Sequence, residues 1–209
     1  MIIDLAIISA FIIISIIILL WIKNIPQNLF TKLRYKSLSS IHDAKHHFVI
    51  GAQLLAKSRS TKDHTLCIKL AKSAAEEADK SISLDPNDAT SHVLKALALD
   101  AQGFSTSALE ALNVALSPLT AKSLSDAERG EALFKRAEIK KGRVESAFED
   151  VFESVKLYGD NAMAFRLLGE CYENKEMKNE AVDAYERAVR IDPNCVAARN
   201  ALIRLCSTI

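Results

Sequence analysis

The chain opens with a continuous apolar stretch and then changes to a regular mixture of apolar and polar positions. From Leu5 to Ile22 no residue carries a charge, and half of the first 22 residues are isoleucine. A helix of this length spans about 27 Å, close to the thickness of the hydrocarbon core of a bilayer. Asp4 precedes the stretch and no small-residue cleavage site follows it, which is unlike a secretory signal peptide. The pattern predicts a transmembrane signal-anchor helix within residues 1–23.

The charges beside this stretch predict how it lies in the membrane. The next segment carries basic residues and no acidic ones, and such flanks stay on the cytosolic side. We therefore expect residues 5–22 to contact the lipid bilayer and the C-terminal domain to be cytosolic. Residues 24–40 are predicted to be a basic juxtamembrane linker that can meet anionic lipid heads. The strongly apolar span favours the endoplasmic reticulum over the outer membrane of mitochondria or plastids. The flanking bases are Lys23, Lys32, Arg34 and Lys36.

Beyond residue 40 the apolar positions recur every three or four residues, which is the period of an amphipathic helix. Ile41, Ala44, Phe48, Gly51 and Leu55 are one such series. No stretch alternates with a period of two, as a half-buried strand does. The sequence therefore predicts an all-α fold.

A short segment recurs within this helical region. Asp85-Pro86-Asn87 returns as Asp192-Pro193-Asn194, each after an apolar residue. The residue before a proline disfavours the helical conformation, so a helix is expected to end at each of these sites. Self-similarity of this kind predicts stacked units that share a core.

The last unit carries the most detailed pattern of small and large residues at set positions. Its members are Phe165, Leu168, Gly169, Tyr172, Ala181, Tyr185, Ala188 and Pro193. This pattern resembles the tetratricopeptide repeat (TPR), a 34-residue pair of helices in which small residues let the helices approach closely. The resemblance implies a superhelix of about four helix pairs over residues 41–209, following the transmembrane helix.

Aligned on that unit, the pattern extends backward through the chain. The first unit has about eleven extra residues, which we expect between its helices near Ser58 to His64. Ser125-Asp126-Ala127-Glu128 is a candidate capping box that opens the third unit. The predicted units are residues 44–88, 89–122, 130–161 and 162–195, followed by a capping helix over residues 196–206.

Composition and known motifs argue against several functions. The chain has 27 basic and 26 acidic residues and a formal net charge of +1, unlike a protein whose bulk grips nucleic acid. Its four cysteines form no Cys-x-x-Cys pair, so neither a disulfide framework nor a zinc site is indicated. Phosphate-binding glycine loops and catalytic signatures are absent from the sequence. We expect no enzyme activity, no cofactor, no metal and no nucleic-acid partner.

Two short patterns carry weaker signals. His42 and His46 lie four residues apart, as metal ligands on one helix face do, but Lys45 and His47 beside them indicate a solvated surface. The C-terminal Cys206-Ser-Thr-Ile has the length of a prenylation box, although its middle residues are not aliphatic. The sequence does not decide whether Cys206 is lipidated.

The resemblance implies a concave surface lined by the first helix of each unit, able to hold a protein or peptide. Acidic residues outnumber basic ones there, which suits a partner with basic and apolar side chains. The sequence leaves open whether these positions are only solvated helix faces. The inward positions are Thr90, Val93, Leu97, Asp100, Glu131, Phe134, Glu138, Lys141, Met163, Arg166, Glu170 and Glu173. The candidate partner-binding residues among them are Val93, Leu97, Phe134, Glu138, Met163, Arg166, Glu170 and Glu173.

These observations predict a membrane-anchored TPR adaptor, with a precursor-import receptor or cochaperone on an organelle outer membrane as the alternative. TPR cochaperones that hold acidic chaperone tails are known for a clamp of lysine, arginine and asparagine. Neither possible alignment of this chain supplies those cations, so the cochaperone function is disfavoured. The residues at the clamp positions are Phe48, Ala52, Leu94, Glu131 and Lys135 in one alignment, and Val93, Leu97, Lys135, Met163 and Leu167 in the other.

Overall fold

The computed structural model describes residues 14–15, 27–140 and 144–206, and every regular element in these ranges is a helix. A short 3₁₀ helix, η1, lies between α5 and α6. The elements are α2 (Gln27–Ser60), α3 (His64–Leu84), α4 (Ala89–Ala101), α5 (Ser105–Ala115), η1 (Ala121–Ser123), α6 (Asp126–Ile139), α7 (Val144–Leu157), α8 (Ala162–Asn174), α9 (Lys178–Ile191) and α10 (Val196–Cys206).

The chain divides into two units, residues 1–42 and residues 43–209. The predicted transmembrane span lies outside the described residues, apart from Ile14 and Ser15, which are helical. Among the described helices, none is both long enough and apolar enough to cross a membrane. Helix α2 begins at Gln27, so most of the predicted linker 24–40 is helical. That part of the linker contains neither proline nor glycine to interrupt a helix.

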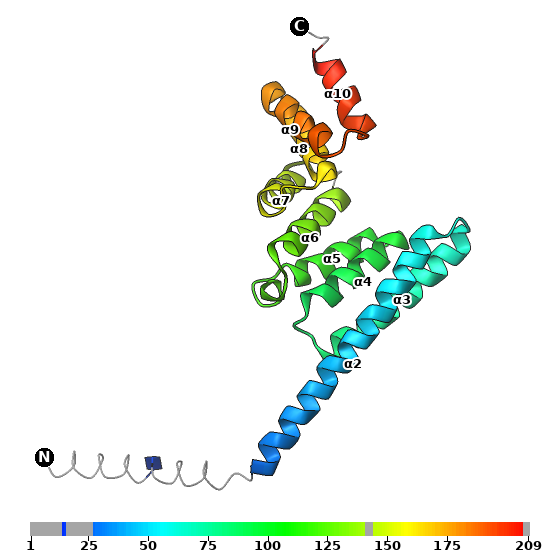
Figure 1. Cartoon of the computed structure of the whole chain (residues 1–209), viewed down its shortest axis with the longest axis vertical. Helices are drawn as coiled ribbons and strands as arrows, with labels where there is room; N and C mark the ends of the chain where they lie inside the picture. The colour runs from blue at the N-terminus through cyan, green and yellow to red at the C-terminus, as the bar shows by residue number, and fades with distance from the viewer. Residues whose placement is uncertain (1–13, 16–26, 141–143, 207–209) are drawn as a thin grey trace, which may run out of the picture. The chain divides into compact units, whose positions relative to one another are not determined.

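Residues 43–206 form the predicted TPR-like stack of helix pairs. The pairs are α2/α3, α4/α5, α6/α7 and α8/α9, and α10 packs on α9 (Figure 1). Each pair contacts the next one, through α3 and α4, α5 and α6, and α7 and α8. The all-α helical-repeat fold expected from the hydrophobic spacing is therefore confirmed.

The first pair differs from the expectation in where its extra residues lie. We expected them between the helices near Ser58 to His64, and this was wrong, because α2 continues to Ser60 and α3 begins at His64. The extra residues lengthen both helices. Asp63 caps α3 by accepting hydrogen bonds from the backbone of Thr65 and Leu66.

The two Asp-Pro-Asn segments form the same turn. As predicted, the preceding helices end just before them, α3 at Leu84 and α9 at Ile191. In the first, the side chain of Asp85 accepts a hydrogen bond from the backbone of Asn87, at 3.3 Å. In the second, Asp192 accepts one from Asn194 in the same way, at 2.9 Å. The recurring sequence thus marks one structural position in two units.

The turns between α4 and α5 and between α8 and α9 are also equivalent. Gly103 has a φ of 87° in the first, and Glu176 has a φ of 60° at the matching place in the second. In both, the residue after this position donates a backbone hydrogen bond of 3.0 Å to the preceding helix, from Phe104 to Leu99 and from Met177 to Tyr172. Glycine adopts a positive φ without strain, whereas glutamate does so at a cost of about 1–2 kcal/mol.

The core is built largely from small residues, which let the helices pack closely. Many of the fully buried positions are alanine, including Ala74, Ala96 and Ala164. The capping box predicted before α6 is confirmed, since the Ser125 side chain accepts from the backbone of Glu128 and the Glu128 side chain accepts from the backbone of Ser125. These features fix the spacing of the first helices, which line the site described next.

Candidate functional site

A groove of about 750 Å³ lies between α2, α4 and α6, the first helices of three successive pairs. Its floor and walls are mainly apolar. Some of these side chains also belong to the core, such as Leu55 and Leu94, which are about 5% exposed. The apolar lining residues are Phe48, Ala52, Leu55, Ala56, Val93, Leu94, Leu97, Ala101, Leu124, Ala132 and Phe134.

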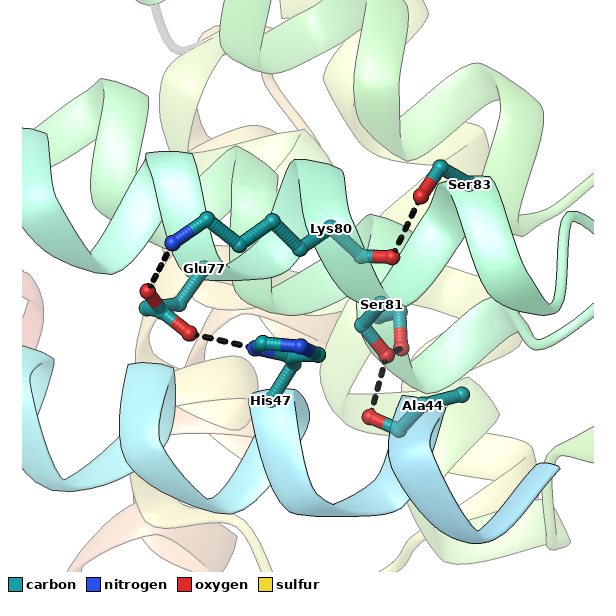
Figure 2. Close-up of polar contacts among 7 residues, drawn as sticks. Ala44, His47, Glu77, Lys80, Ser81 and Ser83 are labelled. Carbon is teal, nitrogen blue, oxygen red and sulfur yellow. Dashed lines mark hydrogen bonds and ion pairs between the residues drawn. The ribbon is translucent and has the colours of Figure 1, made fainter. Parts of the chain in front are cut away.

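The α2 wall of the groove is fixed to α3 by two sets of polar contacts (Figure 2). Glu77 bridges the helices, with one carboxylate oxygen 2.7 Å from Nδ1 of His47 and the other 2.6 Å from Nζ of Lys80. Ser81 is 1% exposed and donates a hydrogen bond of 2.8 Å to the backbone oxygen of Ala44. Buried polar contacts of this kind hold one arrangement of two helices, because breaking them leaves polar groups without partners.

Helices α4 and α6 run in the same direction along the groove. The backbone N–H of Ala89, at the start of α4, donates to Oγ of Ser123 just before α6, at 3.0 Å. Toward the other end, Nζ of Lys135 lies 3.7 Å from a carboxylate oxygen of Asp100. The start of α4 contacts the start of α6, and the end of α4 contacts the later part of α6. Both helices therefore begin at the same edge of the groove.

Most charged groups in the groove are engaged by neighbours within the domain. Lys135 is shared between Asp100 and Glu138, with Nζ 2.6 Å from the latter. Glu128 belongs to the capping box, and the hydrogen bonds from Ser125 hold the pKa of the Glu128 carboxyl below its ordinary value. Arg59 and Glu131 are exposed lining residues with no ion pair in the described part of the chain.

The candidate residues chosen from sequence fall into two groups. Val93, Leu97 and Phe134 line the groove, together with Thr90, Asp100 and Glu131 from the inward positions. Glu138 lies beside it, bonded to Lys135. The inward Lys141 lies outside the described residues.

The four candidates on α8 do not line this groove. Met163 is 44% exposed. Arg166 forms an ion pair with Glu170, one turn later on the same helix. These three side chains therefore lie on α8 apart from the hollow formed by the earlier units.

Glu173, the fourth, joins α8 to the last two helices. Its carboxylate accepts a hydrogen bond of 2.6 Å from the hydroxyl of Tyr185 on α9 and lies 2.7 Å from Arg204 on α10. Burial alone raises the pKa of the Glu173 carboxyl, but these two partners outweigh it and hold the pKa below its ordinary value. Burial and the bond to Glu173 raise the pKa of Tyr185 far above its usual range. Glu173 thus fastens the capping helix.

The contribution of α2 was missing from the candidate binding set. Phe48, Ala52, Leu55 and Arg59 all line the groove. The signal that could have found them is their spacing of three and four residues along one helix, which continues the apolar series through Phe48 and Leu55. The repeat alignment also points to this wall, because it places Phe48 and Ala52 at the clamp positions of the first unit.

The described residues contain no group of three or more histidine, cysteine, aspartate or glutamate side chains placed to hold a metal. His42 and His46 are both exposed. Cys206, in the last turn of α10, is exposed. Cys171 and Cys195 are buried free thiols.

Acid is expected to weaken the contact between α2 and α3. Hydrogen bonds from Lys80 and His47 hold the pKa of the Glu77 carboxyl below its ordinary value of 4.5. A group whose pKa is lowered by folding stabilises the fold above its ordinary pKa, and this contribution disappears as the pH falls through the lowered pKa. Between about pH 6 and about pH 3, we expect the wild-type chain to lose about 0.5–1 kcal/mol more unfolding free energy than Glu77→Gln.

Urea denaturation followed by circular dichroism measures this difference. Glu76→Gln is the matched control, because Glu76 is an exposed neighbour on the same helix. If the wild type and Glu77→Gln lose the same unfolding free energy on acidification, the Glu77 carboxylate does not stabilise the contact between α2 and α3.

Comparison with known proteins agrees with this architecture. The sequence model of the tetratricopeptide repeat family matches residues 162–195, the α8/α9 unit. The PilF protein of Pseudomonas aeruginosa superposes with a TM-score of 0.64 at 17% identity, over 81% of this chain and 70% of its own. MamA of Desulfovibrio magneticus RS-1, from residue 41 to its end, superposes with a TM-score of 0.62 at 18% identity, over 79% of this chain and 85% of its own.

A search of curated proteins gave no match. At such low identity the structural likenesses establish the fold alone. Solenoids of stacked helix pairs generally offer an extended concave surface for binding. The chain therefore has a TPR-like helical-repeat fold, and its last helix pair, residues 162–195, matches the tetratricopeptide repeat family model.

Proposed function

We propose that this chain is a membrane-anchored TPR adaptor that binds a protein partner in the groove between α2, α4 and α6. The observation that carries the proposal is the groove itself, which combines a volume of about 750 Å³ with a mainly apolar lining. Helical repeats bind partners on concave surfaces of this kind, and apolar grooves take up apolar faces of protein segments. The stacked helices provide the rigid support that such a site needs.

The proposed anchor is the uncharged stretch from Leu5 to Ile22. A span of this length and hydropathy inserts favourably into a bilayer, and the basic flank after it favours a cytosolic C-terminal domain. An anchor confines the groove to a membrane surface and thereby raises its effective concentration toward partners on that surface. We place the chain in the endoplasmic reticulum.

Imaging and protease protection test this placement. A fluorescent protein fused after residue 40 is expected to mark the endoplasmic reticulum, and protease added to sealed vesicles is expected to digest the C-terminal domain. Labelling of a mitochondrial or plastid rim would instead favour the alternative, an import receptor on an organelle outer membrane. Full protection of the domain would overturn the cytosolic topology.

A charged side chain in the groove is expected to abolish partner capture. Ala56 is an exposed lining residue of α2, so Ala56→Glu places a carboxylate where a partner must bury apolar surface while the helix remains intact. Burying an unpaired charge in an interface typically reduces affinity by tenfold or more, roughly 2 kcal/mol or above. Quantitative proximity labelling in cells, followed by pull-down of the labelled proteins, measures the loss.

Ala197→Glu is the matched control, because Ala197 is also an exposed helical alanine but lies on α10. Both variants are expected to give wild-type circular dichroism spectra. If Ala56→Glu and Ala197→Glu recover the same amounts of labelled partner proteins, the groove is not the binding site.

A further inference from the structure

The lining of the groove restricts which form of polypeptide it can hold. An extended peptide in an apolar groove needs partners for its backbone N–H and C=O groups, because buried unpaired polar groups are destabilising. The polar side chains along the groove are mostly engaged already. Thr90 bonds Asp88, Asp100 bonds Lys135, and the oxygen of the Asn161 side chain accepts from the backbone of Ala164.

An α-helix satisfies its own backbone groups and presents only side chains to its surroundings. An amphipathic helix can therefore lay an apolar stripe onto these leucine, valine and phenylalanine side chains without leaving backbone groups unpaired. The lining runs from Phe48 to Arg59 on α2 and from Thr90 to Ala101 on α4. Each of these segments is about 16 Å long, the length of a three-turn helix.

The two charged lining residues without an ion pair in the described part of the chain lie on opposite walls of the groove. Glu131 belongs to α6 and lies one turn before Lys135, which meets Asp100 near the end of α4. Arg59 belongs to α2, on the other side of α4.

Resting on the proposed function, we infer that the groove binds an amphipathic α-helix of about three turns. Its apolar stripe faces the groove, a basic side chain on one flank of the stripe faces Glu131, and an acidic side chain on the other flank faces Arg59. Opposite charges at two separate points fix the position of a helix that apolar contacts alone would let slide. Lys135 is already paired with Asp100 and Glu138, so Glu131 and Arg59 are the charged side chains offered to the bound helix.

Synthetic peptides test this inference with the full chain in detergent micelles. The first probe is a 14-residue alanine-based helix with leucines at i, i+3, i+4 and i+7, a lysine on one flank of that apolar stripe and a glutamate on the opposite flank. The second replaces its central alanine with proline, which breaks the helix, and the third carries glutamate at both charged positions. Affinities are measured by fluorescence anisotropy.

We expect the proline peptide to bind at least about tenfold more weakly than the first probe. Glu131→Lys is expected to weaken binding of the first probe about fivefold and to strengthen binding of the double-glutamate probe by a similar factor. Glu186→Lys, an exposed charge reversal on α9, is expected to change neither affinity. A variant that fails to fold would bind both probes more weakly, so misfolding cannot explain weaker binding of one probe together with stronger binding of the other.

Equal binding of the helical and proline peptides would overturn the inference, as would a Glu131→Lys variant that weakens both charged probes alike. Failure of all three peptides to bind would overturn it as well. These peptide results do not test the proposed function. That function is tested by comparing the partners recovered from cells with the wild-type chain and with Ala56→Glu.

Discussion

Replacing Gly169 with valine is expected to lower the free energy of unfolding by about 3 kcal/mol or more. A Cβ at this position meets three ring carbons of Tyr185 at 2.7 to 2.8 Å, well inside normal contact distance. Tyr185 is 1% exposed and its hydroxyl is bonded to Glu173, so the ring cannot move aside without breaking that bond. The branched side chain therefore forces α8 and α9 apart. Urea denaturation followed by circular dichroism measures the loss.

Two variants control for this result. Gly159→Val is expected to change the unfolding free energy by no more than about 0.5 kcal/mol, because Gly159 is exposed and an added Cβ meets only a backbone oxygen at 3.6 Å. The double variant Gly169→Val/Tyr185→Ala is expected to be more stable than the sum of its single effects implies, since the missing ring leaves room for the valine. Strict additivity would mean that the contact with Tyr185 is not the cause.

Removing the ring at Tyr185 is expected to destabilise the chain by about 3–5 kcal/mol. Tyr185→Ala leaves a cavity among Ala164, Leu168 and neighbouring core residues, and it deprives Glu173 of one of its two partners. Because Glu173 also holds Arg204, we expect α10 to separate from the stack before the rest unfolds. Hydrogen exchange detected by mass spectrometry should show faster exchange over residues 196–206 than in the wild-type chain.

Tyr185→Phe separates packing from hydrogen bonding. It keeps the ring and removes only the hydroxyl bond to Glu173, so we expect a loss of about 1 kcal/mol. If Tyr185→Phe were as unstable as Tyr185→Ala, the hydroxyl bond rather than the buried ring would be the main source of stability. Unchanged exchange over α10 in Tyr185→Ala would show that Glu173 does not fasten the capping helix.

The sequence predicts the last helix pair best, and the structure gives the reason. Gly169 on α8 lies against the ring of Tyr185 on α9, and a Cβ at residue 169 would overlap that ring. The turns at Asp85 and Asp192 were equally visible, because proline and a self-bonding aspartate produce the same stop in any helix. These turns depend only on neighbouring residues, so the sequence alone can predict them.

The groove was only partly predictable. The repeat alignment gives Val93, Leu97 and Phe134. It also gives Phe48 and Ala52 on α2, but Arg59 lines the groove only because that helix continues to Ser60. Charge was the least informative property. Glu173 and Glu131 look alike in the sequence, yet one is bonded to Tyr185 and Arg204 while the other stands exposed at the groove. Whether a glutamate is bonded within the fold or left exposed depends on side chains from other helices, which the local sequence does not reveal.

The succession of contacts along the stack has a consequence for how the protein ages. In the described part of the chain, most contacts of each helix pair are with its immediate neighbours, and the groove belongs to α2, α4 and α6, whereas Tyr185, Glu173 and Arg204 lie on α9, α8 and α10. Damage in such an array weakens with distance from the damaged unit. A molecule clipped or oxidised near its C-terminus is therefore expected to keep the shape of its groove.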